Sequence, residues 1–412
     1  MKVALVNPNR LRNPPVIPIG LEYVAHAVRQ AGHEAAILDL CFADDANAAV
    51  DAFLSACRPE VAFLSIRNVD SVIRAEDQFF LDAHRDIARR ITDAGIPLVV
   101  GGAGLPAMPE RIAKYLGAAV AVNGPGEGAA VRILDAMAAR QPLPLVNNGF
   151  DASYDAMVVP RRGVDVDYAA YYAAGGVVGF ASSYGCPCDC PFCIEAGTGV
   201  RFRAIEAVVR EVRGLVEAGW SRMHLCDAEM NPTLDHAVSL CRAMIGAGAS
   251  WMTYMRCRPM SEELASTLRQ SGCDLATVTV NSATDTPAEA VRCVQLLKAQ
   301  GVSVAVDLSC GLPDETPDRA RSMIAALHDA GPDRVGVTVR FRLTPTTPLA
   351  ARIRADAAEQ RWTTGDPEFF GPAYYCRFDP AEVQSWLAGL RNFAIDTGEA
   401  VNYQRLAKTT LP

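Results

Sequence analysis

The sequence predicts an α/β protein with two parallel sheets, and three observations support this fold class. Short apolar segments alternate with helical repeats through residues 1–150, which is typical of a doubly wound parallel sheet. A second series of alternating strands and helices runs from about residue 176 to residue 350. Glycine, proline and polar residues follow the apolar segments, at the strand ends where parallel sheets bind their ligands.

The first series begins with an apolar strand at Lys2–Asn7. The helical period of Leu21–Ala31 ends at Gly32, a residue type that favours the position just after a helix. Four further segments predict the remaining strands: Glu34–Leu40, Val61–Ser65, Pro97–Gly101 and Ala118–Val122. We therefore expect a first domain at residues 1–150.

The rest of the chain divides into three parts. Residues 151–175 are predicted to be a linker. Residues 176–350 form the second series, in which Ala204–Ala218 has a helical pattern and Trp251–Arg258 reads as a strand. Residues 351–412 are expected to form a short C-terminal extension.

Composition limits the class of protein. Half of the 412 residues are hydrophobic and 21% are charged, which fits a compact enzyme. The net charge of −8 argues against a nucleic-acid partner and is compatible with a cationic substrate. No apolar run reaches the roughly 18 residues of a membrane span, and the N-terminus reads as a strand, not a signal peptide. Thirteen cysteines predict a reducing, cytoplasmic location.

Four of these cysteines lie within eight residues, after an apolar segment. Cys186, Cys190 and Cys193 have the spacing CxxxCxxC and can hold three irons of a [4Fe–4S] cube. The fourth iron is then open to a chelating molecule, whereas ordinary ferredoxin clusters use four cysteines. We expect Cys188 to be a bystander. A zinc site is the alternative, but the other cysteines are scattered singly, without the second ligand pair that zinc sites usually have.

With Phe192 before its last cysteine, this motif resembles that of the radical S-adenosylmethionine (SAM) superfamily. The resemblance implies that SAM binds the fourth iron, next to Phe192, through its amino and carboxylate groups. One electron would cleave SAM to methionine and a 5′-deoxyadenosyl radical, which removes a hydrogen from the substrate. It also implies that residues 176–350 form a partial (β/α)6 barrel with its chemistry at the strand ends.

Residues 1–150 resemble the Rossmann-like, cobalamin-binding-like domain that precedes many radical SAM cores. The likeness is carried by Pro15–Tyr23, by Ala31-Gly32-His33 with Asp39, and by Gly124–Glu127. The Asp-x-His-x-x-Gly motif that supplies a cobalt ligand in other cobalamin proteins is absent. Cobalamin therefore remains an alternative that we do not favour at this stage, and a domain kept only as scaffold is the other.

The resemblance also implies positions for SAM-binding residues. Asp227, Glu229 and Asn231 follow a strand and can accept hydrogen bonds from an ammonium and two hydroxyls. The alternative is that they cap the helix that starts near Leu234. One of Arg256 and Arg258, preferably Arg256, would meet the SAM carboxylate, unless both form only a salt bridge. Ser282 and Arg340 complete the expected set of cofactor-binding residues.

Two reactions fit these features. The first is radical dehydration of a sugar or aminoglycoside-like natural product, a lyase reaction of antibiotic-type biosynthesis. Glu229 and Tyr254 are candidate acid or base residues for this reaction, with Asp227 and His224 as alternatives. The missing cobalt ligand, the short extension and the acidic balance favour it slightly. The alternative is a cobalamin-dependent radical SAM C-methyltransferase. A non-catalytic iron–sulfur or zinc protein is a remote third reading. An electron donor such as flavodoxin or ferredoxin, and a partner reductase, are the expected protein partners.

Overall fold

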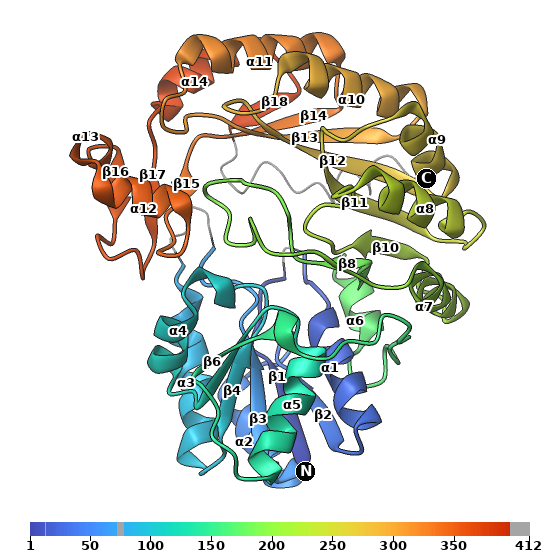
Figure 1. The fold of residues 1–412 in the computed structure, drawn as a ribbon, viewed down its shortest axis with the longest axis vertical. Helices are drawn as coiled ribbons and strands as arrows, with labels where there is room; N and C mark the ends of the chain where they lie inside the picture. Colours follow the sequence, from blue (N-terminus) through green and yellow to red (C-terminus); the bar gives the residue numbers. More distant parts are fainter. Residues whose placement is uncertain (13, 72–77, 396–412) are drawn as a thin grey trace. The chain divides into compact units, whose positions relative to one another are not determined.

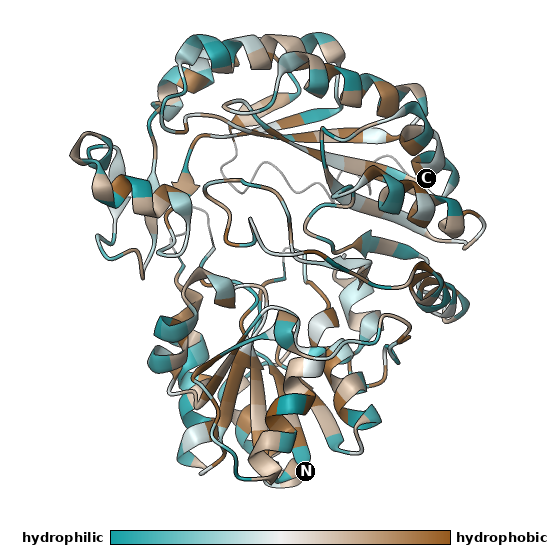
Figure 2. Cartoon of the chain, viewed as in Figure 1, coloured by the Kyte–Doolittle hydropathy of each residue, from teal (hydrophilic) through white to brown (hydrophobic). Residues whose placement is uncertain are grey.

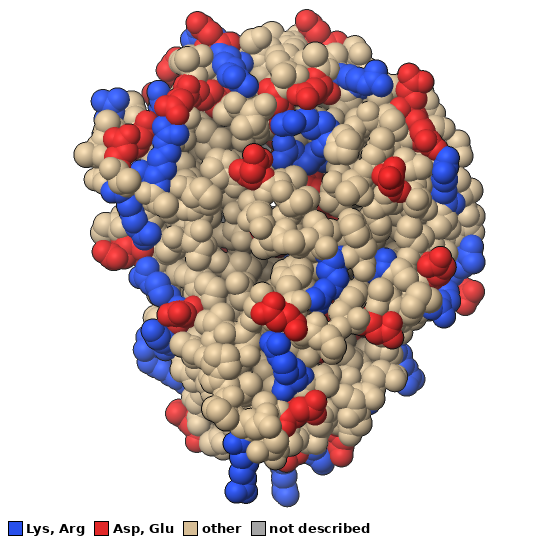
Figure 3. Space-filling model, viewed as in Figure 1, with Lys and Arg blue, Asp and Glu red and all other residues tan. Residues whose placement is uncertain are grey.

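A computed structural model describes residues 1–12, 14–71 and 78–395 of the chain. The described residues form two compact units. One holds those of residues 1–179 together with Thr344–Thr346, and the other holds those of residues 180–343 and 347–395. Among the described residues, no helix is both long and apolar enough to cross a membrane. On the face drawn in Figure 3, acidic and basic side chains are interspersed.

The first unit is a six-stranded sheet in which all neighbouring strands are parallel. The strand order is β2-β1-β3-β4-β5-β6, so the chain reverses its direction of winding after β2, as in a doubly wound sheet. The strands are β1 (Lys2–Asn7), β2 (Glu34–Asp39), β3 (Val61–Ser65), β4 (Leu98–Gly101), β5 (Val120–Asn123) and β6 (Val146–Asn148).

Helices cover both faces of this first sheet. One group contains α1 and α5, which pack together, and the other contains α2, α3 and α4 (Figure 1). The helices are α1 (Ile19–Gln30), α2 (Ala46–Cys57), α3 (Phe80–Asp93), α4 (Pro109–Leu116), α5 (Glu127–Ala138) and α6 (Tyr168–Ala173). The strands are apolar and the outer helix faces hydrophilic (Figure 2), which matches a sheet buried on both sides.

The segment that the sequence predicts to be a linker carries α6 and binds to α1. Glu22 is 3% exposed and accepts hydrogen bonds from Arg162 Nε (2.8 Å), the Gly163 amide (2.7 Å) and the Tyr168 hydroxyl (2.6 Å). A buried carboxylate is stable only when it is paired and hydrogen-bonded in this way. Within the described residues, this segment therefore belongs to the first unit.

The second unit is built on a seven-stranded sheet with the order β18-β14-β13-β12-β11-β10-β7. Neighbouring strands from β10 to β14, and β14 with β18, pair in parallel. The strands are β7 (Val178–Phe180), β10 (Arg222–Leu225), β11 (Ser250–Arg256), β12 (Cys273–Asn281), β13 (Ser303–Ser309), β14 (Arg334–Thr338) and β18 (Phe393–Ile395). The predicted series of six strands is thus extended by β18, which comes from the C-terminal extension.

The helices of the second unit lie along one face of this sheet (Figure 1). They are α7 (Ile205–Glu217), α8 (Leu234–Met244), α9 (Glu262–Gln270), α10 (Pro287–Ala299), α11 (Pro317–Ala330) and α14 (Pro380–Trp386). Hydroxyl side chains fix where four of them begin, because each accepts a hydrogen bond from an amide of the first turn: Thr233, Ser261, Thr286 and Thr316. The cap of α8 is therefore Thr233, and not one of the carboxylates or the asparagine that precede it.

Two small sheets complete the second unit. The strands β8 (Ser183–Tyr184) and β9 (Arg201–Phe202) pair antiparallel. The other sheet has the order β15-β17-β16 and is accompanied by two helices. Its elements are β15 (Phe341–Arg342), α12 (Pro348–Ala355), α13 (Ala357–Gln360), β16 (Thr363–Gly365) and β17 (Ala373–Tyr375).

Candidate cluster and cofactor site

The four clustered cysteines lie on the loop that joins β8 to β9. The loop is closed by its own hydrogen bonds: the Cys186 amide donates to Thr198 Oγ1 (2.9 Å) and the Gly197 amide to the Cys188 carbonyl (2.7 Å). Thr198 Oγ1 also donates to the Glu195 carbonyl (2.8 Å). The positions of the cysteines are therefore set by backbone contacts within the loop.

The same loop is anchored to the small sheet that contains β15. Phe192 packs against Phe341, with ring centroids 5.0 Å apart, and it borders a buried apolar cluster that includes Leu343 and Leu349. The Leu349 amide donates to the Pro191 carbonyl (2.8 Å). Phe192, predicted to lie beside SAM, thus has a clear packing role in holding the loop.

The thiols have the chemistry that an iron–sulfur cluster requires. Cys186 is buried, and Cys190 and Cys193 are partly buried. Burial raises the pKa of the Cys190 thiol to about 11 and also raises the pKa of Cys193. Because iron binds thiolates, cluster binding must displace protons there. Across the described residues, no three Cys, His, Asp or Glu side chains converge on one point for a single ion. A cubane binds each thiolate through a different iron, so it does not require three side chains to converge on one point.

A buried arginine faces the loop. Arg256, the last residue of β11, donates from Nη1 to Cys190 Sγ (3.4 Å) and from Nη2 to Asp285 Oδ1 (3.0 Å). Arg258 also reaches Asp285 Oδ1, from Nε (3.2 Å), but half of its side chain is exposed. The expected salt bridge is therefore present, between both arginines and Asp285. Arg256 in addition contacts a cysteine of the motif.

Asp227 is a fully satisfied buried carboxylate. Its Oδ1 accepts from the amides of Ser182 (2.7 Å) and Ser183 (3.1 Å). Its Oδ2 accepts from the two serine hydroxyls, with 3.0 Å to Ser183 Oγ. Burial raises the pKa of Asp227, and these hydrogen bonds oppose the rise. Asp227 thus holds the strand that leads into the cysteine loop, and all four hydrogen bonds come from the protein.

Glu229, two residues further on, is partly buried, and only one of its carboxylate oxygens has a hydrogen-bond partner within the described residues. Its Oε1 accepts from Thr279 Oγ1 (2.9 Å), while its Oε2 finds no hydrogen-bond partner among the described residues. Burial raises the pKa of Glu229 to about 8, against the lowering by Thr279 and by the charge of Arg256. The charge of Glu229 in turn raises the pKa of Cys190 and Cys193. The structure thus brings Glu229, Arg256 and the motif cysteines together.

Asn231 joins two loops. Its Nδ2 donates to the carbonyls of Arg256 (3.0 Å) and Pro259 (2.8 Å), and its Oδ1 accepts from the Arg256 amide (2.9 Å). Both amide donors are therefore used to fix the end of β11. Asn231 holds the backbone of Arg256 in place.

Ser282 is likewise engaged within the protein. It is fully buried after β12, and its hydroxyl contacts the Ser309 carbonyl (2.9 Å) and the carboxylate of Glu315. Glu315 accepts the Gly311 (2.7 Å) and Leu312 (3.2 Å) amides through its other oxygen. The two residues connect the ends of β12 and β13.

Tyr254 and Arg340 are the two remaining predicted site residues. Tyr254, in β11, has its ring 5.8 Å from the ring of His224. Arg340, between β14 and β15, is partly buried, and its Nε has no hydrogen-bond partner in the part of the chain that the structure describes. Arg340 therefore has a donor available for an anionic ligand.

The sequence did not predict the residues that hydrogen-bond to the candidate site residues. Asp285 is fully buried between the two arginines, and Thr279 supplies the hydrogen bond to Glu229. A usable signal existed for Asp285, because Arg256 and Arg258 alternate onto one strand face and require a carboxylate. Nothing local in the sequence indicated Thr279 or the serines that bind Asp227.

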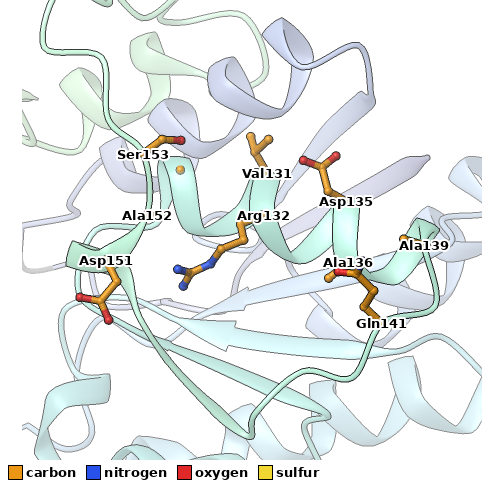
Figure 4. A pocket seen from close by; sticks show the side chains of 10 residues that line it. Val131, Arg132, Asp135, Ala136, Ala139, Gln141, Asp151, Ala152 and Ser153 are labelled. Carbon is orange, nitrogen blue, oxygen red and sulfur yellow. The ribbon is translucent and has the colours of Figure 1, made fainter.

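A surface cavity of about 480 Å³ lies elsewhere, in the first unit (Figure 4). It follows α5, where Arg132 and Asp135 line it, and continues to Asp151 and Ser153. None of the predicted site residues lines this cavity. We therefore assign it no part in the site.

Comparison with known families matches the two units separately. Residues 12–134 match the B12 binding domain family, and residues 181–327 match the radical SAM superfamily. The first range contains strands β2 to β5, and the second contains the cysteine loop and strands β10 to β13. The resemblance drawn from the sequence is thereby confirmed for both units.

Two curated relatives and one solved structure are similar to most or half of the chain. Tryptophan 2-C-methyltransferase of Streptomyces laurentii is 27% identical over 85% of this chain and 74% of its own. Hopanoid C-3 methylase of Methylococcus capsulatus is 26% identical over 53% of this chain and 45% of its own. The structure of the radical SAM methyltransferase TsrM from Kitasatospora setae, with cobalamin and a [4Fe–4S] cluster bound, superposes with a TM-score of 0.87. It covers 96% of this chain and 92% of its own at 23% identity, which establishes a shared fold.

Proposed function

This chain is a radical SAM enzyme with an N-terminal B12-binding domain, and from that premise we propose that it is a cobalamin-dependent C-methyltransferase acting on a small molecule. The observation that carries the proposal is the pairing of these two domains in a chain whose two curated relatives are both methylating enzymes. The sequence alone slightly favoured dehydration over methyl transfer. We now favour methyl transfer over dehydration.

The cysteine loop is the part of the proposal with the clearest chemical support. Cys186, Cys190 and Cys193 would hold the [4Fe–4S] cluster, and Cys188 would not. When bound, the cluster supplies single electrons and an open iron for SAM, and cobalamin supplies a carrier for the methyl group. Within the described residues, one carboxylate oxygen of Glu229 has no hydrogen-bond partner, which suits the SAM ammonium or a substrate proton. Among residues 1–12, 14–71 and 78–395, Arg340 Nε has no hydrogen-bond partner, and it suits a carboxylate of SAM or substrate.

The match of the first unit to the B12 binding domain family supports cobalamin as its ligand. Residues 102–104 follow β4 and residues 124–126 follow β5, at the edge where such sheets bind ligands. Gly102 has φ +107°, and a Cβ there would meet the Ile66 carbonyl at 2.7 Å. His33 precedes β2, and its Nδ1 lies 3.1 Å from the amino group of Met1, which is the opposite edge of the sheet. We therefore expect cobalamin to be held without His33 as a cobalt ligand.

The substrate is proposed by class. One relative is a tryptophan methyltransferase, so tryptophan is the first compound to test, followed by other small indoles and amino acids. A flavodoxin- or ferredoxin-type donor is the expected source of electrons if the reaction consumes any.

The test uses full-length protein reconstituted anaerobically with iron, sulfide and hydroxocobalamin. SAM with a deuterated methyl group is supplied together with tryptophan, and the products are identified by mass spectrometry. We expect bound cobalamin, S-adenosylhomocysteine, and deuterium in the methylated product. A cobalamin-free protein that forms 5′-deoxyadenosine and a dehydrated sugar product would instead restore the dehydratase reading.

A further inference from the structure

The position of Arg256 is determined on three sides. Its guanidinium bridges Cys190 Sγ and Asp285 Oδ1, at 3.4 Å and 3.0 Å. Its backbone amide and carbonyl are both bound by the side chain of Asn231. Only 9% of its side chain is exposed. The cation therefore has little freedom to leave the cysteine.

Asp285 is itself held in place. It is fully buried, and its second oxygen accepts from the Asn281 amide (2.7 Å). A planar guanidinium can bind two acceptors at once in a fixed geometry, which an ammonium group does not do. The contact between Arg256 and Cys190 is therefore built from strand β11, the loop after β10 and the loop after β12.

Such a contact would change the reduction potential of a cluster bound at Cys190. Reduction adds one negative charge to an iron–sulfur cluster, and its potential depends on net charge, on hydrogen bonds to sulfur and on solvent exposure. A permanent cation that donates a hydrogen bond to a ligand sulfur stabilises the reduced form more than the oxidised form, and burial reduces the screening of this interaction by water.

We propose that Arg256 raises the reduction potential of the cluster by donating a hydrogen bond to its Cys190 ligand. This role differs from binding the SAM carboxylate, which the resemblance suggested for the same residue. It rests on the proposed cluster at Cys186, Cys190 and Cys193, and it does not depend on the substrate or on methyl transfer.

Arg258 provides a matched control. It lies two residues away, and its Nε contacts the same oxygen of Asp285 at 3.2 Å. It also forms an ion pair with Glu289 (3.8 Å), and half of its side chain is exposed. Replacing Arg258 therefore removes a cation from the same carboxylate without removing the hydrogen bond to Cys190.

The experiment is a redox titration, followed by electron paramagnetic resonance, of full-length wild type, Arg256→Gln and Arg258→Gln after iron–sulfur reconstitution without SAM. At the wild-type midpoint potential, we expect the ratio of reduced to oxidised cluster to fall about tenfold in Arg256→Gln, equivalent to about 59 mV. Arg258→Gln should stay within about twofold of wild type.

Three outcomes would overturn the proposal: an unchanged midpoint in Arg256→Gln, an equal shift in Arg258→Gln, or loss of the cluster from every Arg256 variant. The variant Arg256→Lys guards against misfolding of Arg256→Gln, and its midpoint should also fall because an ammonium cannot bridge both acceptors. Wild-type protein that binds no iron would instead refute the proposed cluster itself, which separates the two failures.

Discussion

Two neighbouring carboxylates on the loop after β10 differ in how their oxygens are hydrogen-bonded. Around Asp227, two serines supply four hydrogen bonds, and every oxygen is satisfied by the protein. Around Glu229, one oxygen is bound by Thr279 and the other has no partner within the described residues. Because an unsatisfied buried oxygen destabilises a fold, its presence points to a ligand, whereas a satisfied one points to architecture. The sequence had given both carboxylates the same role.

The cysteine loop contains a similar pair of roles, because three of its cysteines are proposed cluster ligands and the fourth is not. It allows the largest effect to be tested. We expect Cys186→Ala, Cys190→Ala and Cys193→Ala to lose essentially all iron–sulfur absorbance and SAM turnover, because each removes one of three ligands. Cys188→Ala should retain both. Visible spectra and iron analysis after identical reconstitution provide the measurement, and loss of the cluster in Cys188→Ala alone would reassign the ligands.

Glu229→Gln tests the unsatisfied side of the comparison. The substitution keeps the shape of the side chain but removes its charge and its ability to accept at both oxygens. We expect product formation to fall roughly 10²-fold or more, as for a lost acid, base or ligand contact. Iron content should remain near wild type, and so should the free energy of unfolding below pH 4.5, where Glu229 is protonated. If activity is retained, Glu229 has no role in binding or catalysis.

Asp227→Ala tests the satisfied side. Two amides and two hydroxyls would lose a buried acceptor, so we expect the free energy of unfolding to fall by about 3 kcal/mol. Asp235→Ala, an exposed position in the first turn of α8, is the control and should cost less than about 1 kcal/mol. Urea denaturation measures both. Equal stabilities would mean that Asp227 is not the structural residue we describe.

The carboxylate of Glu229 also predicts a pH dependence of stability. The pKa of Glu229 is raised from 4.5 to about 8 in the folded protein, so unfolding releases a proton between these values. The stability associated with protonated Glu229 is complete below pH 4.5 and is lost as pH rises to about 8, by at most about 1.4 kcal/mol per pH unit. In ligand-free protein, Glu229→Gln should therefore gain stability relative to wild type between about pH 6 and pH 8. A constant difference across this range would contradict the raised pKa.

The sequence predicted well what depends on short-range pattern. The apolar runs at Lys2–Asn7 and Val61–Ser65 became β1 and β3 with the same bounds, because a buried parallel strand needs an uninterrupted apolar segment. The cysteine spacing was equally local. The seventh strand, β18, was missed because three residues at an edge leave no comparable pattern.

Hydrogen bonds between distant side chains could not be predicted from the sequence, because they depend on which loops lie next to one another in the fold. Asp285 lies 29 residues from Arg256, and Thr279 lies 50 residues from Glu229. The parallel register of β10, β11 and β12 brings both pairs together. Arg256 ends β11, and Asp285 follows the adjacent β12. Glu229 and Thr279 come from the loop after β10 and from β12, the two strands that flank β11. The general edge of the sheet could be predicted, but the choice between a structural and a ligand-binding carboxylate required the contacts.

The attachment of the cysteine loop to β15 and α12 sets an order of events during synthesis. The Pro191 carbonyl is bound by Leu349, and Phe192 packs on Phe341, about 150 residues later in the chain. The apolar cluster around them is completed only by Phe369, Ala373 and Tyr375. A nascent chain that has just released its cysteines from the ribosome therefore cannot yet hold them in place. Iron–sulfur delivery is best suited to a nearly finished polypeptide, and a chain stopped before these residues would present its thiols on an untethered loop.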